Sequence, residues 1–146
     1  MKLIAHRGNI DGPTEFENDP KYIMDVLQQG YEAEVDVWIE DNKIMLGHDF
    51  ARYEVAEEYL VDIHKASWFH AKNLEALRYL LDFNEFRTFW HQNDDFTLTS
   101  NGIIWTYPGK EITTRSIIVA KTLEDTLCYG DKDLYGVCSD YVGELR

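Results

Sequence analysis

The chain has 146 residues, a length that fits one domain over residues 1–146. It carries 27 acidic and 14 basic side chains, a formal charge of −13 at pH 7, and this field repels nucleic acids and anionic membrane surfaces, so we expect neither as a partner. With no signal-peptide pattern, no apolar run long enough to span a membrane, and two cysteines without the spacing of a disulfide framework or a zinc site, the chain is expected to be cytoplasmic.

The first predicted strand is the apolar run "KLIAHRGN", residues 2–9, which ends on His6, Arg7 and Gly8. Strand ends are where α/β proteins place their chemistry, and a glycine there lets the backbone turn close to a ligand. In so acidic a chain, an anionic ligand requires positive groups that are gathered locally in a pocket. The histidine and arginine at this strand end are candidates for such groups, together with Lys72.

A helix is predicted next, because Asp19 and Pro20 suit the N-cap and the first helical position and Gly30 suits the C-terminal cap. Apolar residues at helical spacing between these caps give the helix one face to bury. The following segment, residues 31–49, is expected to form two strands that are joined by a tight turn at Asp41-Asn42.

The first of these two strands has an apolar face and an acidic face. Period-two alternation places Glu34, Asp36 and Trp38 on one face, opposite Ala33, Val35, Val37 and Ile39. Two carboxylates at i and i+2 can converge on one Mg²⁺ or Ca²⁺, although an isolated pair is more often a solvent-facing edge. Here the pair is accompanied by other strand-terminal polar residues, namely His6, Arg7, His48, His70 and Lys72.

Strands and helices continue to alternate along the rest of the chain. A strand "SWFHAK" leads into a helix "NLEALRYLLDF", and further short strands are expected in "TFWHQ", "GIIWTY", "SIIVAK" and "LYGVCSD". This order argues for a parallel α/β barrel or sheet, but a complete (β/α)8 barrel takes at least about 200 residues. We therefore predict an abbreviated TIM-type (β/α) barrel whose outer helices are shortened or missing in the second half. A homo-oligomer interface could cover the surface that those helices leave open.

Four motifs in order, "AHRGN", "EFEN", "EAEVDV" and "GHD", give residues 3–49 a resemblance to a known family. They resemble the N-terminal half of the glycerophosphodiester phosphodiesterases, a TIM-barrel group of phospholipase-C-like phosphodiesterases, and "LYGVCSDY" looks like the closing strand of that family. The resemblance implies a phosphoric diester hydrolase of lipid metabolism, with a divalent metal cofactor and a small-molecule phosphodiester substrate. By position, it implies functional roles for His6, Arg7, Glu34, Asp36 and His48.

The chain departs from the family pattern on the third strand. The family usually has Glu-x-Lys there, and the glutamate completes the metal site, whereas this chain has His70-Ala71-Lys72. We predict Glu34, Asp36 and His70 as metal ligands. An imidazole in place of a carboxylate weakens a site for Mg²⁺ or Ca²⁺ and favours Mn²⁺ or Zn²⁺. The missing length also removes loops that shape the alcohol-binding part of the pocket, so the alcohol part of the substrate is not carried over.

Phosphodiester chemistry explains why these residue types are needed. The negative charge of the phosphate shields phosphorus from a nucleophile, so Arg7, Lys72 and the cation are predicted to hold the non-bridging oxygens. Hydrolysis also needs a proton acceptor and a proton donor, and His6 and His48 are predicted to be this pair.

Two other functions stay open at this stage. One is a non-catalytic barrel that binds a phosphorylated ligand, which the histidine at position 70 and the short chain suggest. The other is a lyase that releases a cyclic phosphate when the substrate has a neighbouring hydroxyl. His91 fits the site and a hydrogen-bonded core position equally well, and Glu17 and Asn18 match the family or form an Asx contact ahead of the helix.

Overall fold

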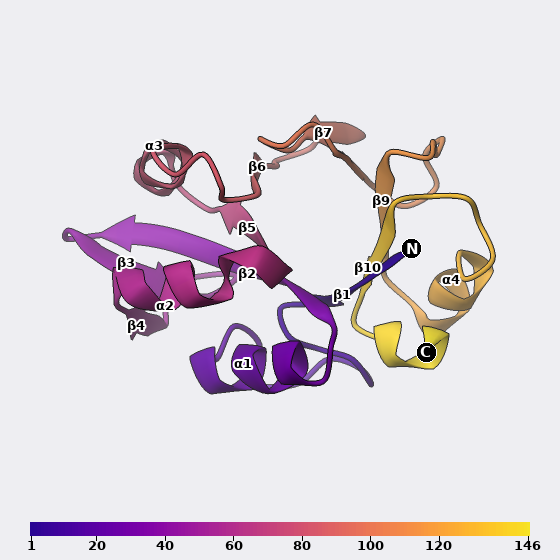
Figure 1. Cartoon of the computed structure of the whole chain (residues 1–146), viewed down its shortest axis with the longest axis horizontal. Coiled ribbons are helices and arrows are strands. Elements are labelled where there is room, and N and C mark those ends of the chain that lie inside the picture. Colours follow the sequence, from indigo (N-terminus) through magenta and orange to yellow (C-terminus); the bar gives the residue numbers. More distant parts are fainter.

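Ten strands form one curled, mixed sheet in the computed structural model, which describes residues 1–146 (Figure 1). Three of them are antiparallel to their neighbours: β3 (Lys43–Leu46) pairs with the end of β2, β4 (Tyr53–Val55) with β3, and β7 (Phe96–Leu98) with β8. The parallel strands lie in the order β6 (Thr88–Trp90), β5 (Ser67–Ala71), β2 (Glu32–Glu40), β1 (Lys2–His6), β10 (Gly136–Ser139), β9 (Ser116–Ala120) and β8 (Ile104–Thr106).

The predicted TIM-type barrel is wrong, because the sheet does not close and most strands lack a covering helix. Strand β6 pairs only with β5, and β7 pairs only with β8, so the sheet forms a half-barrel. A (β/α)8 barrel needs a helix after each strand, but residues 91–103 lack an apolar helical face and contribute β7 instead. The only α-helices are α1 (Pro20–Gln28), α2 (Glu57–Ile63), α3 (Leu74–Leu81) and α4 (Leu123–Cys128).

The helices are short and unevenly distributed. Figure 1 shows α1, α2 and α3 around the half of the molecule that contains β2 to β5, whereas α4 lies beside β9 and near the C-terminus. Two 3₁₀ turns, η1 (His64–Ala66) and η2 (Val142–Leu145), complete the secondary structure. None of the helices has both the length and the apolar character that a membrane crossing requires.

Local signals in the first half of the sequence are confirmed. The Asp19 side chain caps α1 by accepting hydrogen bonds from the backbone N–H groups of Lys21 and Tyr22. The turn between β2 and β3 has Asp41 and Asn42 at φ values of 50° and 60°, which is the left-handed geometry of a tight hairpin. Short polar residues tolerate this backbone conformation, so the hairpin register is set locally.

The two faces of the sheet pack against different cores. The outer face of β2 buries its alternating Ala33, Val35 and Val37 against the helices, as period-two alternation predicts. Inside the curl, Ile4, Trp68, Ile117 and Cys138 pack together at one level. Two residues further along the same strands or just beyond them stand His6, His70, Val119 and Asp140, which line a cavity. The apolar inner core thus supports a polar layer at the carboxyl ends of the strands.

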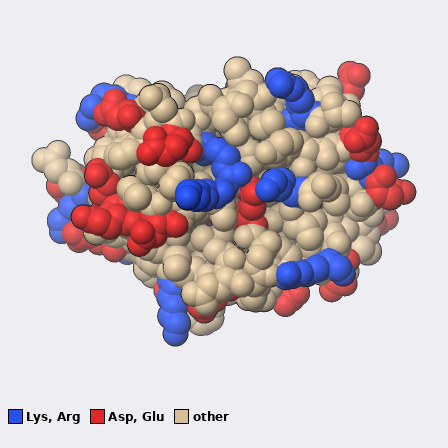
Figure 2. Space-filling view, in the orientation of Figure 1, with Lys and Arg blue, Asp and Glu red and all other residues tan.

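Charged side chains are unevenly spread over the surface. In Figure 2, acidic side chains gather over the side that carries α2 and β4, and Lys and Arg side chains stand near the centre of the face. Other Lys and Arg side chains stand at the edges of this face, so they form no single patch on it.

Candidate functional site

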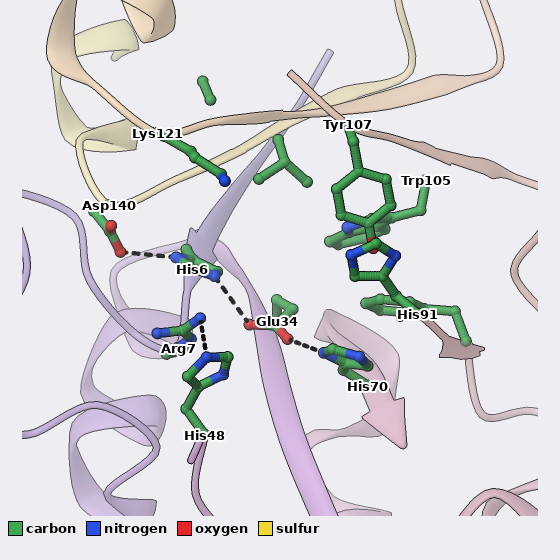
Figure 3. A pocket seen from close by; sticks show the side chains of 13 residues that line it. His6, Arg7, Glu34, His48, His70, His91, Trp105, Tyr107, Lys121 and Asp140 are labelled. Atoms are coloured by element: carbon green, nitrogen blue, oxygen red, sulfur yellow. Dashed lines mark hydrogen bonds and ion pairs between the residues drawn. The ribbon is translucent and has the colours of Figure 1, made fainter. Parts of the chain in front are cut away.

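A cavity of about 470 Å³ opens at the carboxyl ends of the parallel strands. Ligand sites of open α/β sheets usually lie at this edge, because strand ends can present polar side chains without breaking the core. Figure 3 shows His6, Glu34 and His70 side by side across three neighbouring strands, with His91 and Tyr107 on another wall. Of these residues, His6, Glu34 and His70 were predicted from their positions on the strands, and the structure brings the three together.

The carboxylate pair lies where β2 changes its neighbour. Strand β1 pairs with β2 as far as His6 opposite Glu34, and β3 takes over that edge from Val37. The chain then turns back at Gly47, where φ is 152° and a Cβ would overlap the carbonyl oxygen of Phe50. This turn brings the following residue, His48, next to the carboxylate pair.

Asp36 is the fully buried centre of the polar cluster. Asn18 holds it from both sides, because its Nδ2 donates to Asp36 Oδ2 at 2.9 Å and its Oδ1 accepts from the Asp36 backbone N–H at 2.9 Å. Burial opposes ionisation, but nearby cationic and imidazole groups hold the pKa of Asp36 well below its ordinary value. These groups are His70 Nδ1 at 3.0 Å, His48 Nδ1 at 3.3 Å, Arg7 Nε at 3.4 Å and Lys72 Nζ at 3.6 Å.

The three predicted metal ligands are brought together. Glu34, Asp36 and His70 are all buried, and one ligand atom of each lies within 4.8 Å of the others. Glu34 Oε2 is buried without a hydrogen-bond partner, which is costly unless a cation or a water satisfies it. Asp36 Oδ1 has only its ion pairs with His70 Nδ1 and Lys72 Nζ. Two such carboxylates beside an imidazole nitrogen fit a divalent cation.

His70 lacks a hydrogen bond that most metal-binding histidines make. Its Nδ1 faces Asp36 at 3.0 Å and Glu34 at 3.4 Å, but its Nε2 is buried and has no acceptor. Most metal-binding histidines use the second ring N–H to fix the ring. Burial disfavours the charged ring, yet hydrogen bonds to the two carboxylates outweigh it and raise the pKa of His70 to about 9. Without a bound cation, this ring therefore supplies the positive charge itself.

His6 is oriented by an aspartate from the other end of the chain. Its Nδ1 lies 2.9 Å from Asp140 Oδ1, which also accepts from Asn9 Nδ2 at 2.8 Å. His6 Nε2 points toward Glu34, at 4.0 Å from its Oε2. Burial opposes charging of the ring, but Asp140 and Glu34 outweigh it and raise the pKa of His6, while His6 lowers the pKa of Asp140.

Asp140→Asn is expected to lower the free energy of unfolding by about 1 kcal/mol, the difference between a charged and a neutral hydrogen bond. The lowered pKa of Asp140 stabilises the fold at pH values above 3.8, the ordinary pKa of aspartate, and this effect is lost as pH falls. The raised pKa of His6 stabilises the fold at pH values below 6.5, the ordinary pKa of histidine, and this effect is lost as pH rises.

The deficit of the Asp140→Asn variant should therefore be largest between pH 3.8 and 6.5 and shrink on both sides of this window. Urea denaturation at a series of pH values measures it. Asp131→Asn is the control, because Asp131 is exposed and pairs only with Lys132. A deficit that does not vary with pH would contradict the His6–Asp140 ion pair.

His48 and Lys72 belong to the same cluster but are already engaged. His48 Nε2 lies 3.1 Å from Arg7 Nη2, and its Nδ1 lies 3.4 Å from Lys72 Nζ. Arg7 also donates to Glu17 Oε2 at 3.1 Å. His48 and Arg7 line the cavity, and Lys72 does not. All of the residues singled out from the sequence thus come together, and their roles remain predictions.

The sequence does not identify Tyr107 and Lys121 as cavity residues, and it leaves His91 between a site and a core position. All three line the cavity. These residues follow β6, β8 and β9, so the strand-end rule could have identified them. Asn18 and Asp140 act through hydrogen bonds to Asp36 and His6, and the motifs "EFEN" and "CSDY" were their only signals.

The pKa of His91 is shifted in the opposite direction from those of His6 and His70. Desolvation outweighs the contribution of Asp94 and lowers the pKa of His91, which favours the neutral ring. Nearby Tyr107 is also strongly desolvated, which raises the pKa of its hydroxyl well above the ordinary value. His91 and Tyr107 therefore present neutral polar groups on this wall, in contrast to the ion-paired groups around Asp36.

Comparison of the chain with known protein families, with curated proteins and with solved structures finds no match. Function is consequently inferred from the residues of this site and from the motifs that they form.

Proposed function

We propose that this protein hydrolyses phosphodiesters with the help of a divalent cation held by Glu34, Asp36 and His70. The observation that carries the proposal is the convergence of these three ligands beside the His6–Asp140 pair. The cavity next to them has room for a small-molecule substrate. The resemblance of the motifs around these residues to those of glycerophosphodiester phosphodiesterases supports the same reaction class.

Positive groups on the cavity lining fit an anionic substrate. Arg7 lines the cavity, and its guanidinium group can hold non-bridging phosphate oxygens. Lys121 also lines it and forms no ion pair, although the chain has 27 acidic residues. Lys72, which was predicted for the same role, lies next to Asp36 and His48 and neutralises the buried carboxylate. We therefore assign contact with the phosphate to Arg7 and Lys121, with Lys72 as support.

His6 fits the role of a proton-transfer group. Asp140 fixes the ring through Nδ1, so that Nε2 faces the cavity beside Glu34. A raised pKa favours the protonated ring, which can then give a proton to the departing alcohol. A bound cation would supply charge stabilisation for the phosphoryl oxygens.

The test is a hydrolysis assay on protein freed of metal by a chelator. We expect bis(p-nitrophenyl) phosphate and glycerophosphodiesters to be cleaved only after Mg²⁺, Mn²⁺, Ca²⁺ or Zn²⁺ is added back. His6→Ala should lower kcat/KM for the glycerophosphodiesters by about 100-fold or more, because a proton donor is lost. Glu34→Gln should abolish the metal dependence of the remaining rate, whereas Glu40→Gln, at the exposed end of the same strand, should behave as wild type.

The products decide between the proposed hydrolase and the alternatives. Phosphorus NMR should show a phosphomonoester, which requires cleavage by water. A cyclic phosphate would identify the lyase instead, and binding of inorganic phosphate without cleavage of any diester would identify the non-catalytic protein. Hydrolysis that is unaffected by a chelator or by Glu34→Gln would contradict the metal site.

A further inference from the structure

A second histidine–aspartate pair lies on the cavity wall formed after β6. His91 follows this strand, and its Nδ1 lies 3.2 Å from Asp94 Oδ2. The ring also stacks on Tyr107, with ring centroids 3.6 Å apart and planes inclined by 19°. Figure 3 shows His91 and His6 on opposite sides, with Glu34 and His70 between them. The carboxylate and the stacked phenol together fix the ring.

The local loop holds Asp94 in place for this contact. The backbone N–H of Gln92 donates to the same oxygen, Asp94 Oδ2, at 3.2 Å. With Asp94 as acceptor, His91 carries its proton on Nδ1, and Nε2 is left as the basic nitrogen. This nitrogen makes no hydrogen bond within the chain, and the ring lines the cavity. The arrangement repeats that of His6, which also uses Nδ1 for an aspartate.

His48, the residue predicted for the second proton transfer, has no free nitrogen. Arg7 Nη2 lies 3.1 Å from His48 Nε2 and can only donate, so the lone pair on that nitrogen is occupied. The other nitrogen, Nδ1, faces Asp36 Oδ2 at 3.3 Å and Lys72 Nζ at 3.4 Å. Proton transfer through His48 would have to break one of these contacts, whereas His91 has Nε2 available.

We propose that His91, oriented by Asp94 and Tyr107, is the general base that takes the proton of the attacking water. The proposal rests on the phosphodiesterase function proposed above. As the oxygen of the water bonds to phosphorus, its proton passes to His91 Nε2. The bond between phosphorus and the alcohol oxygen breaks with both electrons going to that oxygen, which takes a proton from His6 Nε2. Exchange with solvent then removes the proton from His91 and returns one to His6.

Two substrates with the same phosphate and different leaving groups test these roles. Glycerophosphocholine releases an alkoxide that needs a proton, and p-nitrophenyl phosphocholine releases a phenolate that does not. Because the base acts on the water, His91→Gln and His91→Ala are expected to lose about 100-fold in kcat/KM on both esters. His6→Ala should lower kcat/KM by about 100-fold on glycerophosphocholine only, because the phenolate of the other ester leaves without a proton. Added imidazole should restore part of the activity of His91→Ala, which loss of a structural contact would not allow.

Control variants separate the proposal from damage to the fold. His64→Ala should keep wild-type rates, because His64 lies outside the cavity and its Nδ1 bonds only the Val61 carbonyl oxygen. Asp94 is a positioning residue, so Asp94→Ala should change the ¹⁵N NMR signature of His91 from the Nδ1–H tautomer to a mixture. Thermal unfolding of each variant checks that it is folded.

Several outcomes would overturn the inference. Folded His91→Gln with wild-type kcat/KM, or a loss seen on the glycerol ester alone, would remove the base role from His91. Equal losses on both esters for His48→Gln, with imidazole rescue of His48→Ala and none of His91→Ala, would assign the role to His48. If the wild-type protein cleaves neither ester with any metal, the phosphodiesterase function itself fails, and the inference fails with it.

Discussion

Asp36→Ala is expected to lower the free energy of unfolding by about 3–5 kcal/mol, the cost of removing one partner from a buried ion pair. Asp36 is fully buried, and the variant would leave Arg7 and Lys72 without the carboxylate that neutralises them. The Asn18 side chain would also lose its acceptor at 2.9 Å. Asp36 and Asn18 are fully buried, and Arg7 and Lys72 are only partly exposed, so the effect is larger than for a surface ion pair.

Urea denaturation followed by circular dichroism measures this change. Asp36→Asn keeps the volume of the side chain and an acceptor for Asn18, so its loss of stability should be smaller than that of the alanine variant. Asp62→Ala, on the exposed side of α2, should change stability by less than about 0.5 kcal/mol. A loss below about 1 kcal/mol for Asp36→Ala would contradict the view that this carboxylate holds the cluster together.

Elements that depend on local signals could be predicted from the sequence. The caps of α1 are short-range contacts, and so is the left-handed turn at Asp41-Asn42. The alternation along β2 places its carboxylates and its apolar residues on opposite faces, and the burial of Ala33, Val35 and Val37 follows from it. Each of these features is decided within a few residues of sequence.

Closure of the sheet could not be predicted in the same way. The two edges of the sheet are β6 and β7, and residues 91–103, which lie between β6 and β8, have no periodicity strong enough to reveal β7. The family resemblance suggested a barrel with alternating helices, but its motifs lie within residues 3–49 and in "LYGVCSDY" near the C-terminus, and they hold no information on residues 50–133. The error therefore arose where the sequence signal was weakest.

The candidate site shows the same division between local and distant information. Residues at strand ends could be identified because parallel strands bring their carboxyl ends to one edge. The contact of His6 with Asp140 joins residues 134 positions apart, and it exists because β10 returns to pair with β1. The engagement of His48 by Arg7 depends on side-chain directions, which the spacing of the motifs does not encode. Positions were thus predictable, whereas hydrogen-bond partners were not.

His70→Glu is expected to raise affinity for Mg²⁺ or Ca²⁺ by about 10-fold or more and to shift the preference away from Mn²⁺ and Zn²⁺. The new carboxylate would add a hard oxygen ligand and a negative charge to Glu34 and Asp36. That charge matters because Arg7 and Lys72 already lie 3.4 and 3.6 Å from Asp36 and compete with a bound cation. The histidine ring also lacks a partner for its second nitrogen, so it is a weakly supported ligand.

His70→Ala should instead weaken metal binding by about 10-fold, because a ligand is removed and none replaces it. Calorimetric titrations of Mg²⁺ and Mn²⁺ into the wild type and both variants measure affinity without requiring catalysis. His64→Ala serves as the histidine control, since it lies on η1 away from the carboxylates. If affinity and metal preference are the same in all of these proteins, His70 is not a ligand. Its role would then be limited to its ion pairs with Glu34 and Asp36, in which it supplies the positive charge that a bound metal would otherwise provide.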